Sequence, residues 1–138
     1  MRNMNFTKDD KNLRNIAEKV IKSYPNLENL KAYKDHVRIG YQWSNKEKKH
    51  KGNITYGDCT LVSEKLKEFI DYDFIITFYV NAHNISPKAQ EMLMYHELRH
   101  IGIDKKDIGD FKFYLEPHTL EDFKDIVEKH GMDWITTL

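Results

Sequence analysis

The stretch SPKAQEMLMYHELRHIG, Ser86 to Gly102, predicts the helix around which the rest of the fold is built. Ser86 suits an N-cap and Pro87 the first helical position, and Gly102 is placed to end the helix. We therefore expect a helix from Pro87 to about Ile101. One stripe of it carries three apolar residues and two histidines: Ala89, Met92, Leu93, His96 and His100. The histidines continue the buried face, where polar nitrogens without partners would be costly.

The segment HELRH, residues 96–100, has the spacing of a metal site. Residues four apart stand one above the other on a helix, so His96 and His100 can bind one metal ion without distorting the backbone. Glu97 lies about 100° around the helix from His96, where it can contact a water bound to the ion. With one further ligand, tetrahedral Zn²⁺ keeps a position for water and lowers its pKa to about 7, so Glu97 becomes the candidate general base. The alternative is a core helix whose histidines are hydrogen-bonded and hold no metal.

His118 is the candidate third ligand. It follows Pro117, and the carboxylates of Glu121 and Asp122 come three and four residues later, where one of them could orient its second ring nitrogen. A surface histidine at the start of a helix is the alternative. His83, which follows an apolar strand, competes as a ligand or as a stabiliser of the developing oxyanion.

Two tyrosines are further candidates for the oxyanion role. Tyr95 precedes the histidine motif, and Tyr114 lies in the short segment FKFYL that leads back toward His118. A phenol could donate a hydrogen bond to the developing negative charge. The alternative for both is packing in or near the core.

Before the histidine helix, the chain predicts a helix and two strands. The spacing of apolar residues from Asp9 to Tyr24 predicts an amphipathic helix, capped by Thr7 or Asp9 and ended by Pro25. YKDHVRIGYQW, residues 33–43, alternates as a half-buried strand does. YDFIITFYV, residues 72–80, is apolar throughout and predicts a central strand or the rim of an active site, where it could pair with an extended peptide.

After the histidine helix, FKFYL predicts a short strand and TLEDFKDIVEKHG, residues 119–131, a final helix. The segment 54–69 predicts a strand followed by a second strand or a helix. The basic stretch SNKEKKHKGN, residues 44–53, predicts a solvated loop between two hairpin strands, with nucleic-acid contact as the alternative.

Composition narrows the class of protein. The length of 138 residues fits one domain, and 22 basic against 22 acidic residues give no general attraction to nucleic acid or membranes. One cysteine, Cys59, excludes an internal disulfide framework, and MRNMNFTKDD lacks the apolar centre of a signal peptide. We therefore expect a cytoplasmic protein that does not enter membranes; the sequence does not predict its oligomeric state.

YHELRHIGID followed by EPHTLEDFKDIVEKHGMDW resembles the putative phage metallopeptidases, zincin-like proteins of phages and prophages that are distantly similar to SprT-like metalloproteases. The likeness extends upstream through ITYGDCTLVSEKLKEF and covers residues 36–134, leaving residues 1–35 as an N-terminal helical extension of the single domain. It implies an α+β fold in which a short mixed or antiparallel sheet of three or four strands packs against the active-site helix, flanked by N- and C-terminal helices. It also implies one Zn²⁺ per chain held by His96, His100 and His118, with Glu97 as catalytic base.

Two functions fit these observations. The first is a zinc-dependent metallopeptidase in which Glu97 activates a metal-bound water to hydrolyse a peptide or protein substrate in a bacterial host. The second is a zinc-stabilised binding module without turnover, which contacts a host protein or nucleic acid through the KEKKHK segment. Glu97 favours the enzyme, because a structural zinc site needs no carboxylate beside an open position and is usually closed by four protein ligands.

Overall fold

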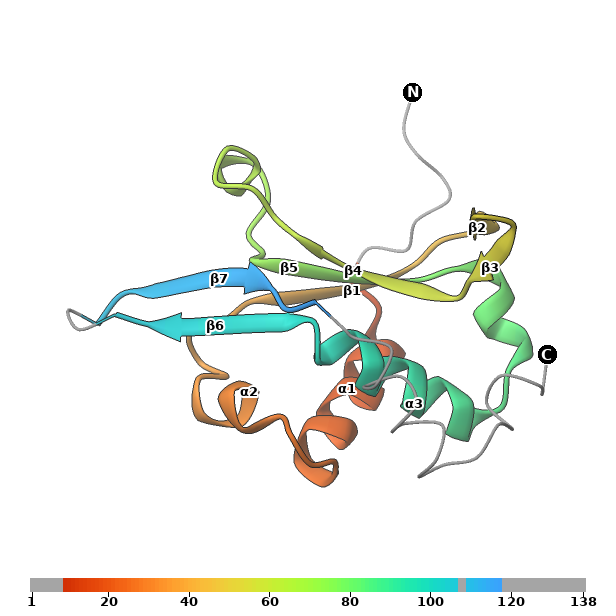
Figure 1. The fold of residues 1–138 in the computed structure, drawn as a ribbon, viewed down its shortest axis with the longest axis horizontal. Coiled ribbons are helices and arrows are strands. Elements are labelled where there is room, and N and C mark those ends of the chain that lie inside the picture. The colour runs from red at the N-terminus through yellow and green to blue at the C-terminus, as the bar shows by residue number, and fades with distance from the viewer. Residues whose placement is uncertain (1–8, 107–108, 118–138) are drawn as a thin grey trace.

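The computed structural model describes residues 9–106 and 109–117, which form an α+β fold (Figure 1). The helices of this part are α1 (Lys11–Ser23), α2 (Glu28–Ala32) and α3 (Pro87–Leu98), with short 3₁₀ helices η1 (Leu66–Glu68) and η2 (Val80–Asn84). The strands are β1 (Ile39–Trp43), β2 (Lys48–His50), β3 (Asn53–Thr55), β4 (Gly57–Leu61), β5 (Phe74–Phe78), β6 (Ile101–Lys105) and β7 (Phe111–Leu115). The predicted fold class is confirmed. The helix predicted over 119–131 lies outside the described residues.

The main sheet has three strands in the order β1-β5-β4, and it is mixed. β1 runs parallel to β5, and β4 runs antiparallel to it. The prediction of a central strand at YDFIITFYV is therefore confirmed. Because both edges of β5 are occupied, the expectation that this strand itself pairs with a substrate peptide is wrong; β4 and β1 are the edge strands.

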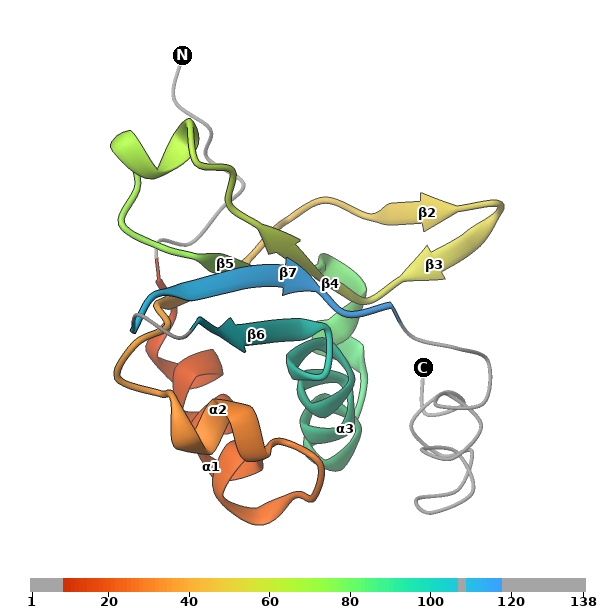
Figure 2. The same cartoon turned by 60° about the vertical axis from the view of Figure 1, so that its left-hand side comes forward.

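Two helices and a hairpin cover one face of this sheet, as Figure 2 shows. Alternate residues of β5 point toward α1 and α3, and all three of them, Phe74, Ile76 and Phe78, are fully buried. The β6–β7 hairpin extends this layer, with the Phe113 ring against Phe74 at a centroid distance of 5.8 Å. The core therefore lies between the sheet and α3.

Helix α1 packs against α3 through its buried residues Leu13, Ala17 and Val20. Its N-cap is Asp10, whose carboxylate accepts a hydrogen bond from the Leu13 N–H at 2.9 Å, one residue beyond the expected cap at Asp9. Asp9 instead binds the Arg14 guanidinium and the Tyr41 N–H. The N-terminal helix thereby forms part of the core layer.

The basic stretch 44–53 forms most of a hairpin of its own, which corrects its prediction as a loop. β2 pairs with β3, and Lys51 and Gly52 form the two-residue turn with φ of 52° and 83°. Two positive φ values are what a type I′ turn requires, and Gly52 adopts one without strain. After β4, the segment whose type the sequence left open contains η1.

Candidate metal centre

Helix α3 positions the histidine motif. The Ser86 hydroxyl accepts a hydrogen bond from the Ala89 N–H at 3.1 Å, and Pro87 occupies the first turn, as predicted. Met92, Met94 and Leu98 are at most 2% exposed, because the sheet packs on one side of α3 and α1 on another. The helix is therefore held rigidly up to its last turn, which carries His96 and Glu97.

The helix ends at Leu98, earlier than the predicted end near Ile101, and β6 begins at Ile101. The His100 N–H donates to the Glu97 carbonyl at 3.1 Å, which is the tighter i to i−3 bond of a final turn. Pairing with β7 then takes over the backbone hydrogen bonds of Ile101 and the residues that follow. His100 thus lies in the turn between a helix and a strand.

Gly102 therefore does not end the helix. It lies in β6 opposite Tyr114, and a Cβ atom at Gly102 would lie 2.4 Å from a carbon of the Tyr114 ring. The Tyr114 ring packs directly over the glycine.

The two histidine rings converge despite the early helix end. The ring centroids of His96 and His100 lie 5.2 Å apart, with their planes 89° apart. His96 is half-buried, and the His100 side chain is 25% exposed. Two imidazoles at this separation can approach one small cation from different directions.

Glu116, after β7, fixes the orientation of His100. The Glu116 N–H donates to the His100 carbonyl at 2.6 Å, and His100 Nδ1 lies 2.9 Å from the Glu116 carbonyl oxygen. Because a carbonyl oxygen only accepts, Nδ1 carries a proton, and in the neutral ring the lone pair is then on Nε2. In metal-binding histidines, the ring nitrogen that does not bind the metal often donates its hydrogen bond to a backbone carbonyl, which fixes the orientation of the ring.

Glu97 is buried beside this pair. It is 4% exposed, and its Oε1 lies 3.9 Å from His100 Nε2. Burial raises the pKa of Glu97 to about 8; the carboxylate of Asp58 adds to the increase and Lys48 opposes it. A carboxylate with this environment is a stronger base than an exposed one.

β4 forms the wall of the site on the sheet side. Gly57 faces Leu93 of α3, so that an added Cβ atom would lie 3.4 Å from Leu93 Cδ1. Burial raises the pKa of the Cys59 thiol, and the nearby Glu97 carboxylate raises it further. This edge strand therefore runs beside the histidine helix.

A third ligand is not found in the described ranges, where no group of three His, Cys, Asp or Glu side chains is placed to hold a metal ion. The predicted ligand His118 lies outside these ranges, which end at Pro117. Pro117 directly follows Glu116, the residue bonded to His100. The described chain thus contacts His100 at Glu116, two residues before His118.

A comparison with protein families finds a match that covers nearly the whole chain. The family described as "Putative phage metallopeptidase" matches residues 4–138. The chain belongs to this family. The match includes α1 and α2, whereas the resemblance inferred from the sequence motifs covers only residues 36–134. No significant match was found among curated proteins or among solved structures.

The family description suggests a peptidase of phages that uses a metal cofactor. Within the described ranges, no helix has the length and apolar character that a membrane span requires.

The other candidates from the sequence lie as follows. The His83 ring stacks on Trp43 at 3.7 Å before α3 begins, whereas His96 is in the last turn of that helix. Tyr95 is 4% exposed and packs against Tyr24 with ring centroids 4.9 Å apart. The structure therefore brings neither His83 nor Tyr95 to the histidine pair.

Tyr114 is linked to the site through Glu116. A hydrogen bond to the Glu116 carboxylate raises the pKa of Tyr114. Glu116 thus contacts Tyr114 through its side chain and His100 through its backbone.

Sequence reasoning considered Glu116 only as a carboxylate that could be the third ligand, and it missed Cys59 as a neighbour of the site. Glu116 contacts His100 through its backbone carbonyl, and the identity of a side chain does not predict such a contact. Cys59 lies near the site only because β4 pairs with β5. The strand predicted at FKFYL, just before Glu116, was the available clue.

Proposed function

We propose that the protein is a zinc-dependent peptidase whose metal is held by His96, His100 and His118. The observation that carries the proposal is the convergence of His96 and His100, whose ring centroids lie 5.2 Å apart beside the buried Glu97. His118 enters the proposal from its motif and from its sequence position two residues after Glu116, a span of at most about 7 Å.

The residues fit a zinc ion. Neutral imidazole nitrogens are among its preferred ligands. Because His100 Nδ1 is hydrogen-bonded to the Glu116 carbonyl, Nε2 is the nitrogen that would bind the metal. Zn²⁺, when bound, supplies Lewis-acid polarisation of the scissile carbonyl and lowers the pKa of water. Three protein ligands would leave one position open, which distinguishes a catalytic site from a structural one.

Glu97 is the general base of the proposed reaction. Its carboxylate accepts a proton from the attacking water and delivers it to the leaving amine nitrogen. Burial supports this role, since a desolvated carboxylate with a raised pKa takes up the proton more readily than one in solvent. The final turn of α3 keeps Glu97 on the side of the helix that faces Cys59 of β4.

The substrate peptide would lie along β4. The Tyr79 N–H donates to the Tyr56 carbonyl and the Val62 N–H donates to the Asp73 carbonyl, so even-numbered residues of β4 bond to β5. In an antiparallel pair, the alternate residues, here Gly57 and Cys59, turn their backbone groups to the outer edge. An extended peptide could pair there and bring its scissile carbonyl toward the histidines.

The test is hydrolysis of unfolded casein by the zinc-loaded protein and its Glu97→Gln variant. We expect the variant to lose activity by at least about 100-fold, because general base catalysis contributes that much, and to keep its zinc. His83→Ala is the matched control. It removes a histidine of η2, which precedes α3, and it should leave turnover unchanged. Full activity in Glu97→Gln would remove this residue from the base role.

The binding-module alternative has less support. Lys48 is engaged by Asp58 at 2.6 Å, and Lys49 by Glu47 at 3.7 Å, so part of the charge of the KEKKHK segment is already paired.

A further inference from the structure

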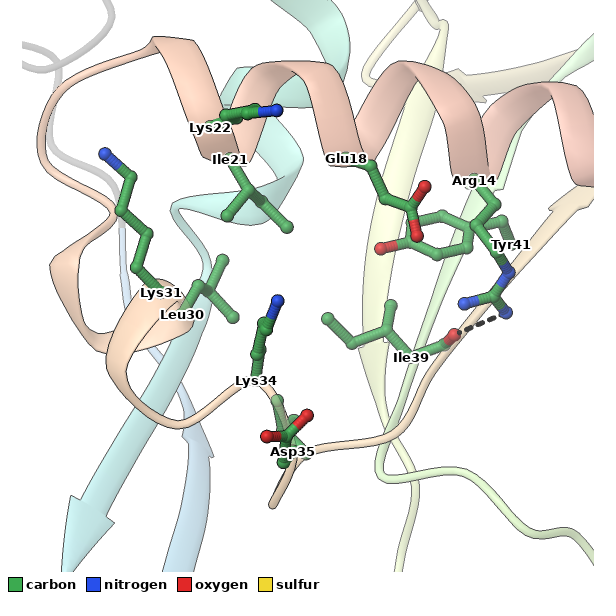
Figure 3. A pocket seen from close by; sticks show the side chains of 11 residues that line it. Arg14, Glu18, Ile21, Lys22, Leu30, Lys31, Lys34, Asp35, Ile39 and Tyr41 are labelled. Carbon is green, nitrogen blue, oxygen red and sulfur yellow. Dashed lines mark hydrogen bonds between the residues drawn. The ribbon is translucent and has the colours of Figure 1, made fainter.

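A cavity of about 670 Å³ lies between α1, α2 and β1, and no residue of the candidate metal centre lines it (Figure 3). Its size falls in the range of small-molecule sites. Its floor is apolar and consists of Ile21, Leu30, Val37 and Ile39. Leu30, Val37 and Ile39 are buried and Ile21 is half-buried, so the floor is the outer edge of the apolar core, and a ligand chain lying here would contact the few atoms that these residues leave accessible.

Tyr41 is the buried polar group of the cavity. It is 3% exposed, follows Ile39 on the same face of β1, and directs its hydroxyl into the cavity in Figure 3. In the part of the chain that the structure describes, this hydroxyl makes no hydrogen bond, and its oxygen is not among the fully buried atoms, so a ligand in the cavity can reach it. Burial raises the pKa of Tyr41, so the phenol stays protonated and can donate.

The charges around the cavity leave one positive charge without compensation. Arg14 is neutralised by Asp9, which its guanidinium contacts at 2.7 Å. Three lysines and two carboxylates of the lining have no ion-pair partner among the described residues: Lys22, Lys31, Lys34, Glu18 and Asp35. Three cations against two anions favour a ligand that carries a single negative charge.

The edge of β1 excludes a peptide bound by strand addition. The Arg14 guanidinium donates to the Ile39 carbonyl at 3.2 Å, and the Asp10 N–H donates to the Tyr41 carbonyl at 2.6 Å. The Tyr41 N–H in turn donates to the Asp9 carboxylate. Because these backbone groups are already bonded, a ligand in the cavity can make ionic and apolar contacts but cannot pair with β1 as an added strand.

We propose that this cavity binds an aliphatic monocarboxylate, with the carboxylate between Lys34 and the Tyr41 hydroxyl and the chain over the apolar floor. Figure 3 shows Lys34 extending into the cavity between Leu30 and Ile39. Lys22 and Lys31 add attraction from the rim, and the anion balances the excess positive charge.

The test is calorimetric titration of the full chain with sodium octanoate. We expect one octanoate per chain, with octylammonium and acetate at least about tenfold weaker, because the first has the wrong charge and the second no chain. Lys34→Gln and Tyr41→Phe should each weaken octanoate binding by about tenfold, the effect of losing a hydrogen bond to a charged group. Lys65→Gln, at an exposed lysine outside the cavity, should leave it unchanged.

Thermal unfolding and zinc content of each variant separate ligand binding from folding and from the metal centre, and neither should change in Lys34→Gln. Absence of octanoate binding to the folded wild type would overturn the proposal. So would equal affinity for octylammonium, or unchanged octanoate affinity in both cavity variants.

Discussion

His100 and Glu116 are joined by two hydrogen bonds, one from the Glu116 N–H to the His100 carbonyl at 2.6 Å and one between His100 Nδ1 and the Glu116 carbonyl at 2.9 Å. The pair links the end of α3 to the end of β7. It holds the His100 ring in one orientation while the chain leaves the helix, and it brings the strand that precedes Pro117 to the histidine motif.

This pairing predicts the tautomer of His100 in the metal-free protein. The Glu116 carbonyl requires the proton on Nδ1, whereas an exposed neutral histidine prefers it on Nε2. Nitrogen NMR of ¹⁵N-histidine-labelled protein above pH 8 should therefore show an Nδ1–H signal that disappears in His100→Gln. An Nε2–H tautomer for His100 would contradict the assigned support of the ligand.

The contact between Gly102 and Tyr114 predicts a coupled pair of substitutions. In Gly102→Ala, the new Cβ would lie 2.4 Å from the Tyr114 ring, which must swing away. We expect the free energy of unfolding to fall by about 1 kcal/mol, the low end of the range for an overpacked contact, because the Tyr114 ring is 37% exposed and can move. In a Tyr114→Ala background the same change should cost much less, because no ring remains to move. Urea denaturation of the four proteins measures this coupling, and equal costs in both backgrounds would refute the contact.

Asp73 predicts how stability responds to acid. Burial would raise the pKa of this carboxyl, but hydrogen bonds from the Arg38 side chain and backbone and from Lys67 outweigh burial and lower it. A lowered folded-state pKa adds stability that is present above the unfolded pKa of about 3.9 and is lost as the pH falls through the folded value. Asp73→Asn should therefore lower the free energy of unfolding by about 2 kcal/mol at pH 7. The difference from wild type should shrink below about pH 4.

Asp71→Asn is the matched control for this experiment, measured by urea denaturation at pH 7 and pH 3. Asp71 also pairs with Arg38, but its side chain is 88% exposed, so we expect a change within about 0.5 kcal/mol. A pH-independent cost in Asp73→Asn would show that packing, and not the charge, is what the residue contributes.

Local patterns in the sequence predicted α1, the central strand β5 and the strand β7 correctly. The same patterns could not locate the end of α3, because Leu98, Ile101 and Ile103 suit both a buried helix and a strand. Pairing of Ile101 with Leu115 decides the structure there, and this contact joins residues far apart in the chain. The basic hairpin was mistaken for a loop for a related reason, since Lys48 and Lys49 are polar and carry no apolar alternation.

The sequence likewise predicted one part of the candidate site and not the other. The spacing of His96, Glu97 and His100 in the sequence identified the motif, and the structure places the two rings together beside the buried carboxylate. The Glu116 carbonyl and the edge strand β4 could not be predicted, because they reach the site through strand register. His118 remains a prediction from its motif.

The most direct test of the peptidase account is the zinc content of untagged protein after zinc addition at neutral pH and removal of excess metal. We predict about one zinc per chain in the wild type and in His83→Ala, and strong loss in His100→Ala and His118→Ala. Glu97→Gln should keep its zinc, because this residue is proposed as base and not as ligand. A wild type that holds no zinc would contradict the account and make the HELRH segment a core helix that contains two histidines.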